Sequence, residues 1–247
     1  MTPSLRIALL SSLGAIALAG CGESKTDPTK EQDVVAKVAA PAGKSWSTTV
    51  VKTAEGGYLM GNPDAPIKVV EFASLTCSHC ADFSKESAEE LKRDFVDTGR
   101  VSLEVRNFIR DPLDAAAAAV IQCAPVERYY PLQENVFASQ AELIQNAQGN
   151  EEGFKAAMAL PPAQRFTGIA KALKLDSFFQ ARGLTADQVN SCLGNIDNIA
   201  KLEKTTNAAI EQYKVSGTPT FVINGQVAEG IAAWGPLRDR LRTLGAR

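Results

Sequence analysis

Apolar and polar positions recur along the chain in stretches that predict individual helices and strands. Residues 67–72 form a short, largely apolar and β-branched run, which is typical of a buried strand. Residues 76–97 place apolar side chains on one helical face and charged ones on the other, which predicts an amphipathic helix. Residues 101–108 alternate and predict a second strand. Because the joins are short, these elements should form a β-α-β unit with parallel strands.

The middle of the chain, residues 111–195, has the pattern of a helical insertion. An alanine-rich stretch at 115–119 has strong helix propensity, and Thr185 is placed to cap a later helix. Further helices are expected at 132–146, 151–158, 164–173 and 186–193. We find no convincing strand pattern in this region.

The pattern then returns to that of a sheet. A helix is expected at 196–213, a strand at 221–223 and a partner strand at 227–228, with Asn224 and Gly225 as a strong hairpin signal between them. The final segment, 234–244, is amphipathic and predicts a helix. The order of elements indicates an α/β fold, in which a mixed central sheet is flanked by helices on both faces.

Composition and charge mainly argue against two classes of function, nucleic-acid binding and the binding of a phosphate-containing cofactor. The 247 residues are 45% hydrophobic and 22% charged, which is ordinary for a globular protein. The net charge of −2 is close to neutral, so we expect no nucleic-acid partner. A glycine-rich phosphate loop is absent from the sequence, and we expect no cofactor.

The N-terminus has the features of an export signal. Residues 1–20 hold one basic residue and then an apolar run that is too short for a stable membrane span. The run ends in Leu-Ala-Gly before Cys21, which resembles the lipobox of bacterial lipoproteins and implies cleavage before Cys21 and its lipidation. The alternative is ordinary cleavage nearby, with Cys21 incidental. Residues 21–57 are then the lipidated cysteine and a flexible tether, and the protein is periplasmic, anchored to the inner or the outer membrane.

Four cysteines remain after Cys21. An even number in an oxidising compartment favours two disulfides, and the spacing favours Cys77 with Cys80 and Cys123 with Cys192. The second bridge would join the two ends of the helical insertion and stabilise it by about 4 kcal/mol. A second redox-active pair is the alternative for Cys123 and Cys192.

Cys77 and Cys80 lie directly after a predicted strand, at the start of a predicted helix. Unpaired N–H groups at a helix N-terminus favour a thiolate, so Cys77 should be the attacking and leaving sulfur, with Cys80 one turn further in and less exposed. His79, the only histidine, either favours that thiolate or is a solvated surface residue. A zinc site needs about four ligands, which the chain does not offer near Cys77, so we expect no metal. A purely structural disulfide is disfavoured because so small a loop gains little stability.

These features resemble the DsbA-like thiol–disulfide oxidoreductases of the thioredoxin superfamily. The resemblance rests on Glu-Phe-Ala-Ser-Leu-Thr-Cys-Ser-His-Cys at 71–80 and on Gly-Thr-Pro-Thr-Phe at 217–221. It implies a thioredoxin fold with an inserted helical subdomain. One departure is Ser78, because the family usually has Pro-His between the two cysteines.

The resemblance also implies roles for three further residues. Pro219 matches the family's cis-proline, which faces the disulfide, and Thr218 would present backbone groups to the substrate chain. The alternative for Pro219 is a trans proline that opens an edge strand. Glu71 matches a buried acid that would relay a proton to or from Cys80, whereas the alternative is a glutamate facing water.

The sequence therefore predicts a membrane-tethered envelope enzyme that exchanges disulfides with cysteine-containing secreted proteins, most simply as an oxidant. The first alternative is an isomerase or reductase of the same fold. Two further alternatives, which rank below it, are a binding module without redox activity and a glutathione-dependent enzyme. We expect a monomer that a membrane redox partner reoxidises. The predicted division is 1–20 signal peptide, 21–57 lipidated cysteine and tether, 58–110 first half of the thioredoxin fold, 111–195 helical insertion and 196–247 second half.

Overall fold

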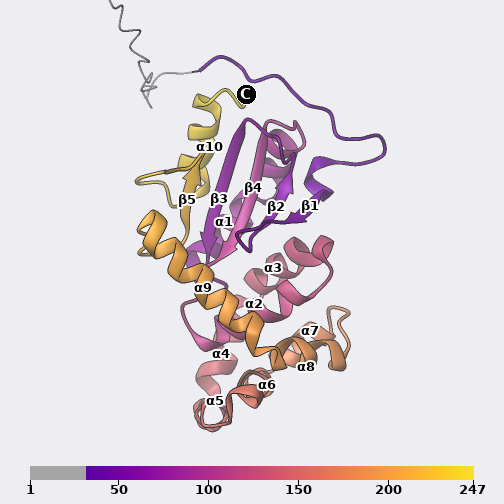
Figure 1. Ribbon diagram of the computed structural model, residues 1–247, viewed down its shortest axis with the longest axis vertical. Helices are drawn as coiled ribbons and strands as arrows, with labels where there is room; N and C mark the ends of the chain where they lie inside the picture. The colour runs from indigo at the N-terminus through magenta and orange to yellow at the C-terminus, as the bar shows by residue number, and fades with distance from the viewer. Residues whose placement is uncertain (1–31) are drawn as a thin grey trace, which may run out of the picture. The chain divides into compact units, whose positions relative to one another are not determined.

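A six-stranded mixed sheet organises the fold, with strand order β1-β2-β4-β3-β5-β6 (Figure 1). The computed structural model describes residues 32–247; the predicted signal peptide and Cys21 lie outside the described residues. The strands are β1 (Val50–Lys52), β2 (Tyr58–Gly61), β3 (Ile67–Ala73), β4 (Val101–Asn107), β5 (Thr220–Ile223) and β6 (Gln226–Val227).

The predicted β-α-β unit is confirmed. β3 and β4 are parallel along their whole length, and α1 (Ser78–Glu90) connects them, followed by the π-helical turn η2 (Leu91–Val96). β5 pairs antiparallel with β3 and brings Phe221 opposite Glu71. The predicted hairpin between β5 and β6 is also present, with Asn224 at φ 49° and Gly225 at φ 82°. Positive φ at both positions is what a tight hairpin turn requires.

Helices cover both faces of the sheet, as the α/β prediction required. Along β3 the side chains alternate: Val69 belongs to the large core on the α1 face, and Phe72 to a smaller cluster with α9 (Ile196–Tyr213). α10 (Trp234–Thr243) packs on α1 and η2, where the Trp234 ring centroid lies 6.4 Å from that of Phe83 of α1 and 5.6 Å from that of Phe95 of η2, edge to face in both cases. The fold is thus the mixed sheet flanked by helices that defines the thioredoxin class.

The insertion is a set of helices that gather at one end of the sheet (Figure 1). They are η3 (Val126–Arg128), α2 (Pro112–Cys123), α3 (Tyr129–Ala138), α4 (Gln140–Gly149), α5 (Glu151–Met158), α6 (Pro162–Ala172), α7 (Leu175–Gln180) and α8 (Ala186–Gly194). The predicted helix at 132–146 is in fact two, because the chain breaks at Ser139. α7 was missed because six residues after Lys174, at φ 59°, are too short to show a helical period.

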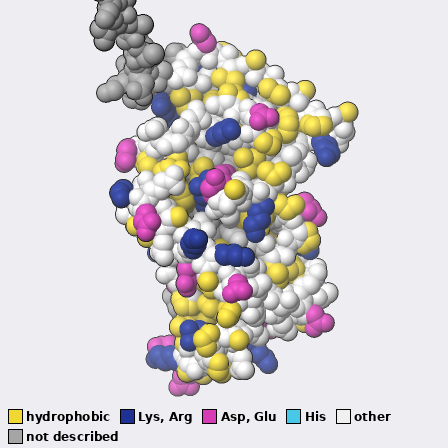
Figure 2. Space-filling view, viewed as in Figure 1, with side chains coloured by type: hydrophobic (Ala, Val, Ile, Leu, Met, Phe, Trp, Pro, Cys, Tyr) yellow, Lys and Arg dark blue, Asp and Glu magenta, His cyan; other side chains and the backbone are white. Residues whose placement is uncertain are grey.

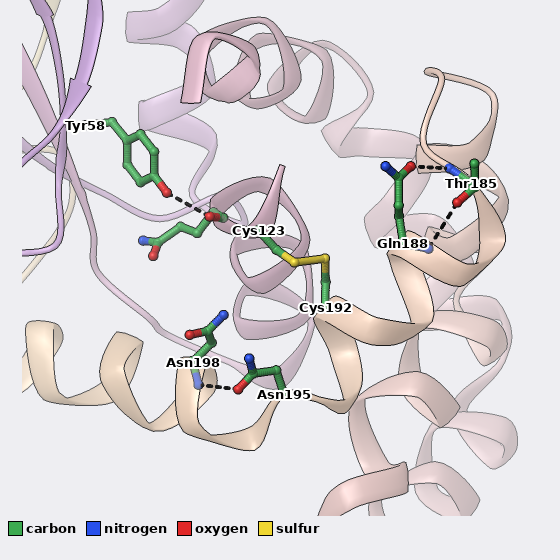
Figure 3. The surroundings of a disulfide bond; sticks show 8 residues. Tyr58, Cys123, Thr185, Gln188, Cys192, Asn195 and Asn198 are labelled. Carbon is green, nitrogen blue, oxygen red and sulfur yellow. Dashed lines mark hydrogen bonds between the residues drawn. A yellow bond between two sulfur atoms is a disulfide. The ribbon is translucent and has the colours of Figure 1, made fainter. Parts of the chain in front are cut away.

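A disulfide joins Cys123 at the end of α2 to Cys192 in α8, with 5.7 Å between the Cα atoms (Figure 3). It links two helices near opposite ends of the insertion, 69 residues apart in sequence. Thr185 caps α8 nearby: its hydroxyl accepts from the Gln188 N–H while the Gln188 side chain accepts from the Thr185 N–H (Figure 3).

The structure differs from the sequence prediction between residues 46 and 52, which were assigned to the tether. η1 (Trp46–Thr48) and β1 belong to the folded unit, since β1 pairs with β2 and Trp46 is buried. The Trp46 indole N–H donates to the Val38 carbonyl at 2.8 Å. β1 is three residues long, with Val50 half-buried and the next two side chains exposed, so it is too short to show an alternating pattern in the sequence.

The surface of the described unit mixes both signs of charge. On the face shown in Figure 2, acidic and basic side chains are interspersed among apolar ones. Within residues 32–247, every helix falls short of the length and apolarity that crossing a bilayer demands.

Candidate active site

The two thiols lie where β3 passes into α1. Cys77 is the N-cap residue of α1, with extended backbone at φ −89° and ψ 120°, and Cys80 lies in the first turn. Both are free thiols in the structure and both are buried, Cys77 at 4% exposure and Cys80 at 0%. The order of exposure agrees with the assignment of Cys77 as the outer sulfur.

The surroundings of Cys77 favour its thiolate. A hydrogen bond from the Cys80 thiol lowers the pKa of Cys77 most, and Thr218 and the N–H groups of Cys80 and His79 lower it further. Burial opposes them, and the net result is a pKa of about 4 for Cys77. An ordinary cysteine has a pKa of about 8.5, so Cys77 is ionised at neutral pH.

Cys80 has the opposite character. Burial raises its pKa strongly, and the hydrogen bond it donates to Cys77 and the charge of Glu71 raise it further. Cys80 therefore stays protonated while Cys77 is ionised. Two neighbouring sulfurs with such different acidities have different roles in an exchange reaction: one leaves readily, and the other must receive a proton to leave.

Glu71 is a buried acid whose charge interacts with both thiols. It lies in β3 at 3% exposure, and its Oε1 atom has no hydrogen-bond partner within residues 32–247. Burial, and secondly the charge of Cys77, raise the pKa of Glu71 to about 8. The carboxyl borders a cavity of about 30 Å³ that Tyr130 and Gln133 also line, which is room for about one water molecule. The alternative of a glutamate facing bulk water is excluded.

The loop before β5 completes the site. The Thr218–Pro219 peptide bond is cis, and Pro219 is buried. The Cys77 thiol donates to the Thr218 carbonyl at 3.1 Å. The Thr218 hydroxyl is buried and has no partner in the described part of the chain, so it is available as a donor to the thiolate. The fold thus brings together the two motifs that are 141 residues apart in sequence.

His79 has an exposed side chain, and its backbone N–H is the group that acts on Cys77. The tuning role expected of its imidazole stays a prediction. Cys123 and Cys192 form their own disulfide and are not part of this site.

Three residues at the site were missed by sequence reasoning: Asp111, Asp114 and Gln140. All come from the insertion and bind the loop that precedes Cys77. Asp111 carried a local signal, since an aspartate followed by proline is typical of a helix start. Asp114 and Gln140 carried none, because their partners lie far away in sequence.

Fold and site together define a class: a thioredoxin-fold protein with a dithiol at a helix N-terminus that faces a cis-proline loop. The chain belongs to the thioredoxin family, whose model, described as thioredoxin, matches residues 53–239.

Known proteins agree with this assignment. The crystal structure of a protein-disulfide isomerase from Novosphingobium aromaticivorans is 37% identical, with a TM-score of 0.72, and the match covers 76% of this chain and 97% of that one. The structure of Wolbachia pipientis alpha-DsbA1 has the same fold, at 24% identity and a TM-score of 0.54 over 70% of this chain and 77% of that one.

Curated relatives include a putative protein-disulfide oxidoreductase of Rickettsia conorii. It is 24% identical over 205 residues, which are 80% of this chain and 66% of the relative. The corresponding protein of Rickettsia bellii is 26% identical over 76% of this chain and 64% of the relative. The chain therefore spans just under two thirds of the length of these relatives.

Proposed function

We propose that this chain catalyses thiol–disulfide exchange and that its net reaction is to donate the Cys77–Cys80 disulfide to cysteine-containing secreted proteins. The observation that carries the proposal is the contrast between the two sulfurs, a pKa of about 4 at Cys77 beside a strongly raised pKa at Cys80. A stabilised Cys77 thiolate stabilises the reduced enzyme, and this makes the disulfide form an oxidant.

The reaction has two steps. A substrate thiolate attacks the Cys77 sulfur, the Cys77–Cys80 bond breaks, and Cys80 leaves and takes up a proton. A second substrate thiolate then attacks the substrate sulfur of the mixed disulfide and releases Cys77 as a thiolate. Two electrons pass from the substrate dithiol to the enzyme, which a membrane redox partner then reoxidises.

Glu71 has the properties of the proton donor in the first step. Cys80 is a poor leaving group unless it is protonated, because burial raises its pKa. Burial is the larger cause of the raised pKa of Glu71, and it also acts in the disulfide form, where Cys77 has no charge. The carboxyl therefore keeps its proton to a higher pH than an ordinary glutamate. Its protonation state would couple the first step to pH.

Thr218 and Pro219 have the position of a substrate-binding edge. The Thr218 carbonyl accepts a bond from the Cys77 thiol when that sulfur is protonated. In the mixed disulfide that acceptor is released, and a substrate strand could bond the same backbone. His79, exposed between the two cysteines, would contact the incoming substrate.

The cellular setting is part of the same proposal. A lipidated Cys21 and a tether would hold a monomeric enzyme on the periplasmic side of the inner or outer membrane, where secreted proteins acquire disulfides. The halves at 58–110 and 196–247 would carry the exchange chemistry, with the insertion at 111–195 stabilised by Cys123 and Cys192.

Isomerisation is the second candidate, because the 37% identical relative of known structure is a protein-disulfide isomerase. An isomerase uses the same Cys77 thiolate, but attacks existing disulfides in substrates and works from the reduced form. Rescue of scrambled ribonuclease by the reduced protein, without an added oxidant, would identify that activity.

The reduction potential of the Cys77–Cys80 pair tests whether the enzyme is an oxidant. We expect a value closer to about −120 mV, as in DsbA, than to about −270 mV, as in thioredoxin. A value at or below that of thioredoxin would contradict the oxidant assignment. Cys77→Ser is the matched control, since it keeps the fold and removes the reacting sulfur.

A further inference from the structure

The loop that joins β3 to α1, Ser74 to Cys77, is bound by the helical insertion at every residue. Asp114 bonds Ser74 and Leu75, Asp111 bonds Thr76, and Gln140 bonds Leu75 and Cys77. The three side chains come from α4 and from the start of α2, so the insertion forms one wall of the thiol site.

Asp114 holds the first half of the loop. Its carboxyl is completely buried and accepts from the Ser74 hydroxyl at 2.6 Å and from the Leu75 N–H at 2.9 Å. The Arg110 N–H donates to the same carboxyl at 3.1 Å. A buried carboxyl that accepts three hydrogen bonds holds its donors in place, because breaking any of these bonds leaves a buried polar group unsatisfied.

Gln140 holds the second half. It is 7% exposed, and its Nε2 atom donates to the Leu75 carbonyl at 2.8 Å and to the Cys77 carbonyl at 3.0 Å. One amide group therefore ties two carbonyls on either side of Thr76. The Ala81 N–H also donates to the Cys77 carbonyl, at 3.2 Å, so this carbonyl accepts two hydrogen bonds. The two donors reduce the negative potential that the carbonyl oxygen creates near the Cys77 sulfur.

Thr76 is the remaining residue, and Asp111 binds it. The Thr76 hydroxyl donates to Asp111 Oδ2 at 2.5 Å, while Asp111 Oδ1 accepts from the Asp114 N–H at 2.9 Å as the N-cap of α2. The cap of an insertion helix and the active-site loop thus share one carboxylate.

We propose that Asp111, Asp114 and Gln140 are positioning residues that fix where the Cys77 sulfur lies against the N-terminus of α1. The inference rests on the proposed thiol–disulfide chemistry. The donors that stabilise the thiolate, which include the N–H groups of His79 and Cys80, act over short distances and in set directions. A loop free to shift would lose part of that stabilisation, so the insertion contributes to the acidity of Cys77 without touching the sulfur.

Gln140→Met tests the proposal, because methionine has a similar volume and shape but no N–H donor. Gln145→Met is the matched control: Gln145 is an exposed glutamine on the same helix. In the reduced proteins, titration of the thiolate absorbance should show the Cys77 midpoint raised by at least about half a pH unit in Gln140→Met, a threefold change in ionisation constant. The control should match the wild type, and the reduction potential of Gln140→Met should move toward that of a reductant.

Thr76→Val is the second variant, for the case that Gln140→Met fails to fold. It is nearly isosteric and removes only the hydroxyl that Asp111 accepts from. We expect a smaller shift of the Cys77 midpoint in the same direction. An unchanged midpoint in a folded Gln140→Met or Thr76→Val protein overturns the positioning role. Failure of the wild type to oxidise substrates would instead refute the proposed function, and the titration would still decide the role of the loop contacts.

Discussion

The Cys77 thiol donates a hydrogen bond to the backbone carbonyl of Thr218 at 3.1 Å, which links the start of α1 to the loop before β5. The same loop presents the buried Thr218 hydroxyl. When Cys77 ionises, it can no longer donate to the carbonyl, and it becomes an acceptor for donors around it. Ionisation of Cys77 therefore removes the bond to the Thr218 carbonyl and makes the sulfur an acceptor for nearby donors such as the Thr218 hydroxyl.

Removing the Thr218 hydroxyl should weaken the thiolate. Thr218→Val keeps the shape of the side chain and loses one donor to a charged acceptor, so we expect the pKa of Cys77 to rise by about one unit. Titration of the thiolate absorbance in the reduced protein measures it. Thr205→Val, at a half-buried position of α9, is the control, and an equal pKa in both variants would show that the Thr218 hydroxyl does not act on the sulfur.

Glu71→Gln should slow the release of Cys80 and remove a pH dependence. The wild-type rate of disulfide donation should fall as pH rises through the pKa of Glu71, which burial raises above the ordinary carboxyl value, after correction for ionisation of the substrate thiol. The variant should be roughly a hundredfold slower below that pH, at the lower end of the range for a lost general acid, and should lack the fall. Glu89→Gln, exposed on α1, should behave as the wild type; a fall at the same pH that persists in Glu71→Gln would assign it to another group.

Glu71 and Cys77 should change the stability of the reduced protein in opposite directions with pH. The folded pKa of Cys77 is depressed to about 4, so its contribution is present above the unfolded pKa near 9 and is lost as pH falls toward 4. The folded pKa of Glu71 is raised from 4.5 to about 8, so it destabilises the fold increasingly as pH rises through that window.

Denaturant unfolding of reduced variants separates the two groups. Relative to the wild type, Glu71→Gln should gain stability as pH rises from about 4.5 to 8, whereas Cys77→Ser should lose it over pH 4 to 9. Parallel profiles for all three proteins would mean that neither group has the pKa assigned to it.

Cys80→Ser should accumulate mixed disulfides through Cys77. Without Cys80, a substrate bound to Cys77 cannot be displaced from within the enzyme, so the adduct persists until another thiol attacks. Non-reducing mass mapping with a peptide disulfide measures it. The adduct should be absent from Cys77→Ser; adducts at both positions in comparable yield would contradict the assignment of Cys77 as the attacking sulfur.

Replacing Cys123 and Cys192 by alanine should affect stability and leave the thiol chemistry intact. The bridge closes a loop of 69 residues, and its loss should lower the free energy of unfolding by about 4 kcal/mol. The reduction potential of Cys77 and Cys80 should stay within experimental error. A large change of potential would indicate that the second pair takes part in electron transfer.

Local pattern was enough to predict much of this fold. The β-α-β unit, the hairpin at Asn224 and the long helix α9 all follow from periodicity and turn residues that lie within a few positions of one another. The short, exposed β1 did not, because its pairing with β2 is decided by a partner strand and not by its own side chains.

The sequence by itself determined which residues can do the chemistry: Cys77 and Cys80 at a helix start, and a Thr-Pro pair before a strand. Only the tertiary structure decided their environment. It buried Glu71 and left its Oε1 atom without a hydrogen-bond partner in the described chain, set Cys77 against Thr218, and brought Asp114 and Gln140 of the insertion onto the active-site loop. The reason is physical: residue type and helix position depend on near neighbours, whereas burial and hydrogen-bond distance, which set acidity, depend on segments that only folding brings together.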